Sequence, residues 1–152
     1  MADISLERMA DQLPTGFADL EADAIADGHR HMTRLATELT EIPAVFHAIY
    51  ACYLDGRLAG IGTMTDEPAL AGQPTWRMRR FYVHRAFRRR NVAKAIATAL
   101  LQNASGSVST VTVHAGNQTA ARFWEAIGFR RVAGLAWSHE RTMPDATNAR
   151  PT

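Results

Sequence analysis

Apolar and polar residues follow two different periods along the chain, and each change of period predicts a change of element. Between Phe17 and Leu39 the apolar residues recur three and four positions apart, the spacing of helices that bury one face. Thr15 is a candidate N-cap for this region, and Gly28 is expected to divide it into two helices. Pro43 ends the region, and a run rich in Val, Ile, Phe and Tyr follows, as expected of a strand.

The same two patterns predict the remaining elements. We expect strands at residues 4–9, 44–54, 58–63, 76–83, 109–114, 129–132 and 135–142, and further helices at residues 92–103 and 117–127. Asp55-Gly56 predicts a tight hairpin turn, residues 66–74 a loop and residues 144–152 a polar tail. Strand, helix and strand follow one another twice in the second half, which predicts parallel pairing at the centre of the sheet.

We therefore expect a mixed α/β fold, a central mixed sheet flanked by helices, in a single domain over residues 1–152. No apolar run approaches the ~18 residues of a membrane span. Acidic Asp3, Glu7 and Asp11 stand where a signal peptide would be basic or apolar. These features predict a cytoplasmic protein without a membrane partner. The single cysteine, Cys52, lies in an apolar strand pattern and is expected to be a buried, inert thiol.

Charge is distributed unevenly along the chain. Residues 1–76 hold four Lys or Arg and twelve Asp or Glu, whereas residues 77–152 hold thirteen and three. The basic half would suit a polyanionic cofactor, and the acidic half would attract a cationic substrate. An unevenly charged, solvated surface is the other interpretation of the acidic half.

The strongest local motif lies where an expected strand ends and an expected helix begins. Arg88, Arg89 and Arg90 stand directly before the helical pattern that starts at Val92. A helix N-terminus presents unsatisfied N–H groups and a positive dipole end, so arginines at this point predict a phosphate site. Asn91 tolerates a left-handed backbone, and the small side chain of Ala93 permits close approach.

A second motif follows at a spacing that fits one family. It consists of Asn117, Ala120-Ala121, Phe123-Trp124 and Gly128-Phe129, after Arg88-x-x-Asn91-x-Ala93. With these two motifs the chain resembles the GNAT superfamily of acetyl-CoA-dependent N-acetyltransferases. The chain departs from the family pattern at Asn91, where the family has glycine, and at Trp124, where many relatives have tyrosine.

This resemblance implies the GNAT fold, with parallel central strands splayed apart to hold coenzyme A. It also implies direct transfer of an acetyl group from acetyl-CoA to a primary amine of a small molecule, peptide or protein. The Val83 N–H would polarise the thioester carbonyl, and Asn117 would lie beside the pantetheine arm or cap the following helix. The residues implied in cofactor binding are Phe81, Val83, Arg88, Arg89, Arg90, Asn91, Val92, Ala93, Asn117 and Trp124.

The sequence identifies no catalytic acid or base. Indole N–H is not a usable acid, so Trp124 is expected to shape the cofactor groove, and positioning of the free amine is expected to carry the reaction. His84 and His114 stand at the ends of two central strands and are the alternative bases. His29 and His31 are two apart on an expected helix and would not face one ligand, so we expect no metal site.

Two other functions remain open. A non-catalytic, coenzyme A-sensing domain would explain the missing tyrosine and the lack of a glutamate base. Nucleic-acid binding through the basic and aromatic segment 77–94 ranks third, because it leaves the motif at Asn117 to Phe129 unexplained. Neither the acceptor amine nor the oligomeric state, with a homodimer as one possibility, follows from the sequence.

Overall fold

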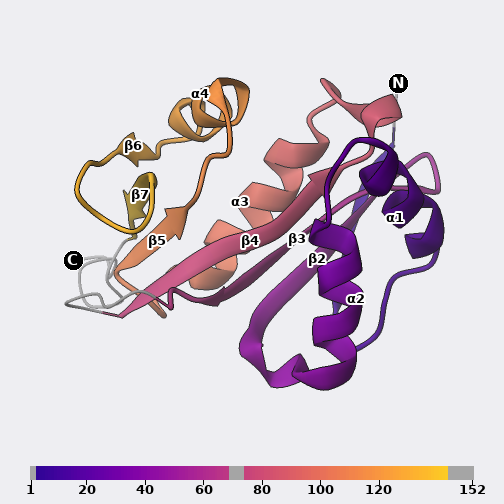
Figure 1. Cartoon of the computed structure of the whole chain (residues 1–152), viewed down its shortest axis with the longest axis horizontal. Coiled ribbons are helices and arrows are strands. Elements are labelled where there is room, and N and C mark those ends of the chain that lie inside the picture. The colour runs from indigo at the N-terminus through magenta and orange to yellow at the C-terminus, as the bar shows by residue number, and fades with distance from the viewer. Residues whose placement is uncertain (1–2, 69–73, 144–152) are drawn as a thin grey trace, which may run out of the picture.

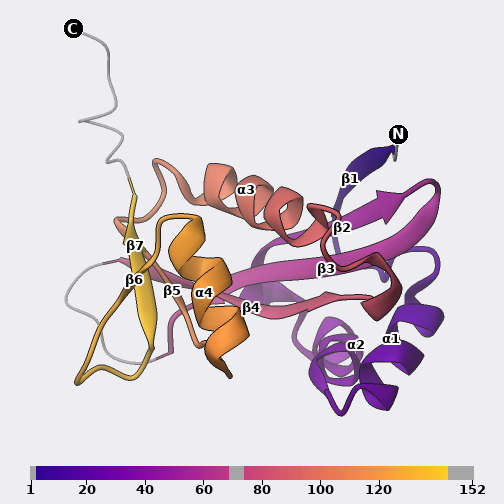
Figure 2. The same cartoon turned by 90° about the horizontal axis from the view of Figure 1, so that it is seen from above.

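One seven-stranded sheet carries the fold, with helices on both of its faces (Figures 1 and 2). The structure is a computed structural model that describes residues 3–68 and 74–143. The strands are β1 Ile4–Met9, β2 Phe46–Leu54, β3 Arg57–Asp66, β4 Thr75–Val83, β5 Thr110–Val113, β6 Arg130–Arg131 and β7 His139–Thr142, in the spatial order β1-β2-β3-β4-β5-β7-β6. The predicted mixed α/β fold is confirmed.

The helices are α1 Phe17–Ala26, α2 His31–Glu41, α3 Val92–Ala104 and α4 Gln118–Ala126, with 3-10 turns η1 Pro43–Val45 and η2 Arg85–Phe87. Figure 2 shows α3 on one face of the sheet and α1 and α2 on the other. Each face carries its own apolar core, because successive residues of a strand point to opposite faces. Met64 of β3 packs with Ile96 and Leu100 beneath α3, whereas Ile61 packs with Leu20 and Leu35 beneath α1 and α2.

The start of α1 differs from the prediction. Gly16, not Thr15, is the N-cap; it has a φ of 88° and provides no side-chain cap. A Cβ on Gly16 would lie 3.2 Å from the Cβ of Leu58, so the chain turns into α1 in tight contact with β3. Gly28, with a φ of 82°, separates α1 from α2 as predicted.

The hairpin between β2 and β3 is confirmed. Asp55 and Gly56 have φ angles of 51° and 81°, and two consecutive positive values are those of a type I′ turn. β2 begins at Phe46, two residues later than predicted, because η1 occupies the preceding residues. β3 continues to Asp66, beyond the predicted end at residue 63, because it pairs with β2 on one side and β4 on the other.

The C-terminal strands are shorter than predicted, and only one of the two expected parallel pairs forms. β4 and β5 are parallel, but β7 lies between β5 and β6 and is antiparallel to both. Residues 135–138 bend instead of extending β7, with Leu135 51% exposed. The predicted loop falls partly and the predicted tail wholly outside the described residues, at 69–73 and 144–152.

β4 loses its parallel partner half-way along its length. It pairs with β5 at three positions, from Thr75 opposite Thr110 to Arg77 opposite Thr112, and β5 ends at Val113. Beyond Arg77, β4 keeps β3 on one side and has no strand beside it on the other within the described parts of the chain. The predicted splaying of the two central parallel strands is therefore confirmed.

β4 also contains a bulge at Arg80. Tyr82 lies opposite Ile61 and Arg79 opposite Thr63, so two residues of β4 face Gly62. Arg80 has a φ of 51°, which is unusual for a residue inside a strand. The extra residue reverses the alternation of faces: Met78 and Phe81 belong to the core beneath α3, and Tyr82 to the core beneath α1 and α2.

Replacing Gly62 with alanine is expected to destabilise the fold by about 1–3 kcal/mol, because the new methyl group would overpack the bulge. Its Cβ would lie 2.7 Å from both Ile96 Cγ2 and Phe81 Cδ2. Urea unfolding measures the loss. Gly116→Ala is the matched control, since a Cβ there meets nothing within 4 Å, and equal stability of the two variants would contradict this account of the packing.

Candidate functional site

The segment that joins β4 to α3 presents the open N-terminus of a helix. Asn91 is the N-cap of α3 in the left-handed conformation, with φ 65° and ψ 13°, and its side chain makes no capping bond. Arg89 also has a φ of 65°. The first N–H groups of a helix lack intrahelical partners, and the first turn of α3 has no acidic residue to attract them. The left-handed Asn91 predicted from the sequence is confirmed.

The three arginines before α3 have different surroundings. The Arg88 guanidinium donates to Asp27 Oδ2 at 2.7 Å and to the Val83 carbonyl at 3.2 Å. Arg89 and Arg90 are exposed and make no side-chain hydrogen bond or ion pair with the residues that the structure describes. Arg89 and Arg90 are therefore the arginines available to an anion at α3, whereas Arg88 ties the segment to α1.

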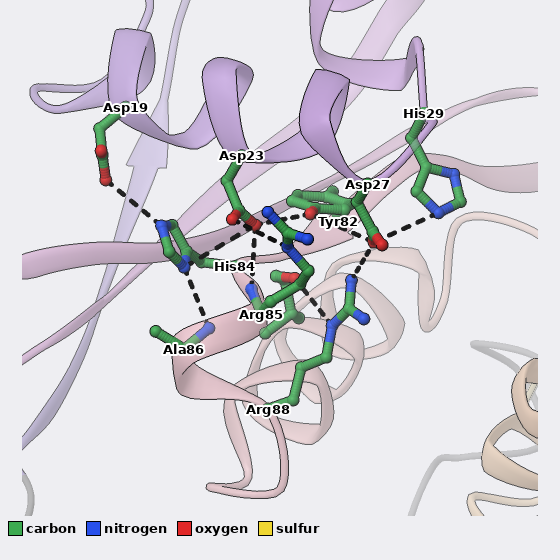
Figure 3. Close-up of polar contacts among 10 residues, drawn as sticks. Asp19, Asp23, Asp27, His29, Tyr82, His84, Arg85, Ala86 and Arg88 are labelled. Atoms are coloured by element: carbon green, nitrogen blue, oxygen red, sulfur yellow. Dashed lines mark hydrogen bonds and ion pairs between the residues drawn. The ribbon is translucent and has the colours of Figure 1, made fainter.

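A row of three carboxylates holds this segment in place (Figure 3). Asp19, Asp23 and Asp27 are four residues apart, so they lie along one side of α1. Asp23 accepts from the Tyr82 hydroxyl at 2.7 Å, from the Arg85 N–H at 3.0 Å and from Arg85 Nε at 3.1 Å. These carboxylates of the acidic half therefore bind the basic half of the same chain.

Protonation states in this row follow from its contacts. Burial acts to raise the pKa of Asp23, but the Arg85 N–H, the Tyr82 hydroxyl, the Arg85 guanidinium and the charge of His84 together lower that pKa to about 2. Burial and the Asp23 carboxylate raise the pKa of Tyr82 well above its ordinary value. Tyr82 is thus a neutral hydrogen-bond donor at physiological pH and holds β4 against α1.

The unpaired side of β4 exposes backbone groups next to this segment. The His84 N–H donates to the Ala59 carbonyl of β3 at 2.8 Å, so the Val83 carbonyl, at the other end of the same trans peptide unit, points away from β3. The N–H of Val83 points the same way, and so do the backbone groups of Phe81, two residues earlier. The two residues predicted to bind through their backbone therefore border the splayed region.

Aromatic side chains line the same region from the α4 side. The Phe81 ring lies 5.3 Å from the Trp124 ring and 6.5 Å from the Phe123 ring, between centroids. Trp124 is 7% exposed and belongs to the core. Asn117 is the N-cap of α4 and accepts from the Ala120 N–H at 2.8 Å, as its capping role predicts. Val92 is also buried, so only its backbone faces the helix end.

A polar group that the sequence did not reveal lies at the end of β5. The Glu67 side chain is 1% exposed, accepts from the Thr112 hydroxyl at 2.7 Å and lies 3.2 Å from His114 Nε2. His114 keeps 32% of its side chain exposed. Glu67 lies in a segment predicted as a loop, and only the pairing of β3 with β4 and of β4 with β5 brings it to His114. No local signal identifies it.

Other titratable candidates have structural roles. His84 Nδ1 accepts from the Ala86 N–H at 3.1 Å and caps η2, while its Nε2 lies 3.4 Å from Asp19. Burial raises the pKa of the Cys52 thiol to about 11, in agreement with an inert thiol. His29 precedes α2, contrary to the expectation that both histidines lie on one helix, and its ring stacks on His31 at 5.7 Å.

Residues 3–68 and 74–143 contain no group of three or more His, Cys, Asp or Glu side chains placed to hold a metal ion. None of the helices there has the length and apolar character needed to cross a membrane. A groove of about 650 Å³ runs between α3 and the end of α4, past Lys94, Thr98 and Gly128; it starts at the first turn of α3 but does not include the arginine segment.

The family model described as "Acetyltransferase (GNAT) family" matches residues 14–129, which include α1, the β4–α3 segment and α4. The chain belongs to the GNAT acetyltransferase family. No curated protein matches the sequence.

Solved structures show the same GNAT fold at low sequence identity. A proposed acetyltransferase from Exiguobacterium sp. 255-15 has a TM-score of 0.80 at 19% identity, over 92% of this chain and 93% of that one. A point mutant of the AtaT toxin, bound to the C-terminus of the antitoxin AtaR and to acetyl-CoA, has a TM-score of 0.69 at 15% identity, over 92% and 93%. Ard1 from Thermoplasma volcanium has a TM-score of 0.66 at 16% identity, over 92% and 97%.

The carboxylate row of this GNAT protein predicts an acid-sensitive fold. Because the pKa of Asp23 is lowered from about 3.9 in the unfolded chain to about 2, its contribution is fully present above pH ~4 and is lost as the pH falls through 2. Asp23→Asn should cost about 1–3 kcal/mol at pH 7 and should flatten the loss of stability between pH 4 and 2.

Urea unfolding at several pH values measures both effects. Asp11→Asn is the control, since Asp11 is exposed and forms no ion pair with the described residues. An Asp23→Asn variant whose stability falls between pH 4 and 2 as steeply as that of the parent protein would contradict the assignment.

Proposed function

We propose that this protein transfers an acetyl group from acetyl-CoA directly to the nitrogen of a primary amine. The observation that carries the proposal is the left-handed Asn91 opening α3 directly beside the unpaired edge of β4. A helix N-terminus and a strand edge without a neighbouring strand then adjoin each other. An extended ligand with a pyrophosphate at one end and two amides in its arm requires such an arrangement.

The residues present fit acetyl-CoA. Arg89, Arg90 and the N–H groups of Asn91 to Ala93 would hold its phosphates, and the backbone of Phe81 and Val83 would bind its pantetheine amides. Asn117 and the rings of Phe81 and Trp124 would line the arm. Arg88 would keep the segment against α1 through Asp27, and its Nε would have to share or release the Val83 carbonyl. Bound acetyl-CoA supplies an acetyl group activated as a thioester.

His114 is the general base in this proposal. The buried Glu67 carboxylate contacts its Nε2 and would orient the ring, which leaves Nδ1 without a partner among the described residues. The substrate ammonium gives one proton to His114, a C–N bond forms as the C–S bond breaks, and a second proton from the nitrogen ends on the released thiolate. Thiols titrate near ~8.5, so the thiolate leaves without a dedicated acid at Trp124.

A non-catalytic, coenzyme A-sensing domain is the second candidate. Trp124 favours it, because this ring is buried against Phe81 and Phe129 and offers no acid at the position where many relatives have tyrosine. Tight binding of acetyl-CoA without release of free thiol in the presence of any amine would support that function instead. Nucleic-acid binding gains no support, since Tyr82 and Phe87 are buried and cannot stack on bases.

Arg90→Ala is expected to weaken acetyl-CoA binding by about 1–3 kcal/mol, because it removes a charged hydrogen bond to a phosphate. S-acetylpantetheine, which lacks the phosphates of the nucleotide, should bind much more weakly than acetyl-CoA and should not distinguish the variant from the parent. Isothermal titration measures all four affinities. Equal affinity for the two ligands would overturn the phosphate assignment.

A control variant elsewhere on the chain and two variants of Asn91 complete this test. Arg130→Ala is the matched control, since Arg130 lies on β6 with a 71% exposed side chain and should leave the affinity unchanged. Asn91→Gly should be tolerated and Asn91→Val should weaken binding, because a β-branched residue resists the left-handed conformation.

The rate against pH is expected to rise over the same pH range for two amines of different pKa, because the base is then His114 of the enzyme rather than the substrate itself. His114→Gln should remove this limb and leave acetyl-CoA affinity unchanged. His47→Gln is the control, since His47 stacks on Trp76 at 4.1 Å, beside the core beneath α3. If the pH at which the rate rises instead follows the pKa of each amine, the histidine mechanism is wrong and the enzyme acts by positioning the free amine.

A further inference from the structure

The sheet face under α2 is polar where β4 and β5 separate. On this face Thr63, Thr65 and Thr112 are buried, although buried positions of a sheet are usually apolar. The buried Glu67 carboxylate accepts from Thr112 and contacts His114, so the candidate base stands at the border of the same face. This surface therefore adjoins the reacting end of the proposed site.

Three arginines of β4, Arg77, Arg79 and Arg80, lie on this face, and Arg80 lies there because of the bulge. Arg77 and Arg79 lie opposite Thr65 and Thr63, so they share the face of those threonines. The extra residue at the bulge lets Arg80 join them instead of pointing toward α3. Arg80 forms a two-pronged ion pair with Glu38 of α2, with Nε and Nη2 distances of 2.7 and 2.8 Å.

Helix α2, which covers this face of the sheet, contributes further charged side chains to the cluster. His31, Arg34 and Glu38 are three and four residues apart and share one face of α2, which packs on β4. Burial and then the charge of Arg80 lower the pKa of His31, so this ring is neutral where the arginines gather. The charges of Arg34, Arg79 and Arg80 thus act on Glu38, and Glu67 acts on Arg77 and Arg79, so four arginines and two carboxylates leave the cluster with an excess of positive charge.

Two polar atoms of this cluster are buried without a hydrogen-bond partner among residues 3–68 and 74–143. They are Arg77 Nε, an obligatory donor, and His31 Nδ1. Buried polar groups are rarely left unpaired in native proteins, and here two unpaired groups lie in one cluster. A ligand with acceptor oxygens would satisfy the arginine donor and offset the excess charge.

We propose that this arginine cluster recognises an oxyanion, a carboxylate or a phosphate, carried by the acceptor amine itself. The inference rests on the proposed function, because it assigns the substrate class of the same site. With its oxyanion against Arg77 and Arg79, a small acceptor would place its amine toward His114, which contacts Glu67 at the border of the cluster. The acceptor is thus a small anionic amine, in contrast to the cationic substrate suggested by the acidic half of the sequence.

The test compares matched pairs of acceptors by release of free thiol from acetyl-CoA. One pair is β-alanine and its neutral amide, and the other is O-phosphoethanolamine and ethanolamine. At least one anionic member should show a kcat/KM at least roughly tenfold above its neutral partner, as a charged hydrogen bond provides. The pair with the larger ratio identifies the group as carboxylate or phosphate. Ratios near one in both pairs would overturn the proposal.

Variants of the arginines show whether these residues cause the preference for an anionic acceptor. Arg77→Gln and Arg79→Gln should reduce the ratio toward one without changing the affinity for acetyl-CoA, and Arg79→Lys should retain part of it because the charge remains. Arg130→Gln, on β6, should leave the ratio unchanged. Unchanged ratios in both glutamine variants, with folding confirmed by circular dichroism, would also overturn the proposal.

Binding separates failure of this inference from failure of the proposed function. If no amine is acetylated, titration of β-alanine and O-phosphoethanolamine into the protein saturated with coenzyme A still decides the question. Binding that is lost in Arg79→Gln supports the anion site although the transferase function is wrong. Absence of binding for both compounds contradicts the anion site.

Discussion

Arg80 occupies a left-handed backbone conformation in the middle of β4, and the arrangement around the splayed strands depends on this one inserted residue. The bulge reverses the alternation of side chains, so Phe81 points toward Trp124 and Tyr82 toward Asp23. It also leaves Arg79 and Arg80 together on the face under α2. Gly62 makes the bulge possible, because a larger residue would collide with Ile96 and the Phe81 ring. The backbone geometry of the bulge thus determines which side chains of β4 lie on the polar face of the sheet and which lie on the apolar face.

Ion pairs between the two halves of the chain fix the segment that follows the bulge. Asp23 and Asp27 of the acidic half bind Arg85 and Arg88 of the basic half, while Arg89 and Arg90 are exposed and form no ion pair with the described residues. The charge asymmetry of the sequence therefore provides ion pairs within the chain at α1, which hold the segment before the helix N-terminus that the proposed function assigns to a phosphate. The part-buried contact of the Tyr82 hydroxyl with Asp23 contributes more to this arrangement than the exposed contacts of Arg85 and Arg88, because water screens exposed charges.

Local signals predicted the parts of the fold that depend on near neighbours. The arginine run before Val92, the left-handed Asn91, the Asp55-Gly56 turn and the N-cap at Asn117 are all as expected, since each needs only a few consecutive residues. Thr15 was a wrong N-cap because contact of Gly16 with Leu58, far along the chain, sets the start of α1. β6 and β7 are short because their length depends on where β5 ends.

The sequence by itself determined the family and the order of elements, because both motifs and the hydrophobic periods are contiguous. It also determined which residues border coenzyme A in the proposal. Only the tertiary structure brought Glu67 to His114 and joined Arg77, Arg79 and Arg80 to α2. Those contacts arise from strand pairing across long separations and from one bulge that shifts the register. Neither the pairing partner nor the register of a strand is encoded in the residues next to it, so the proposed acceptor side of the site emerged only from the folded chain.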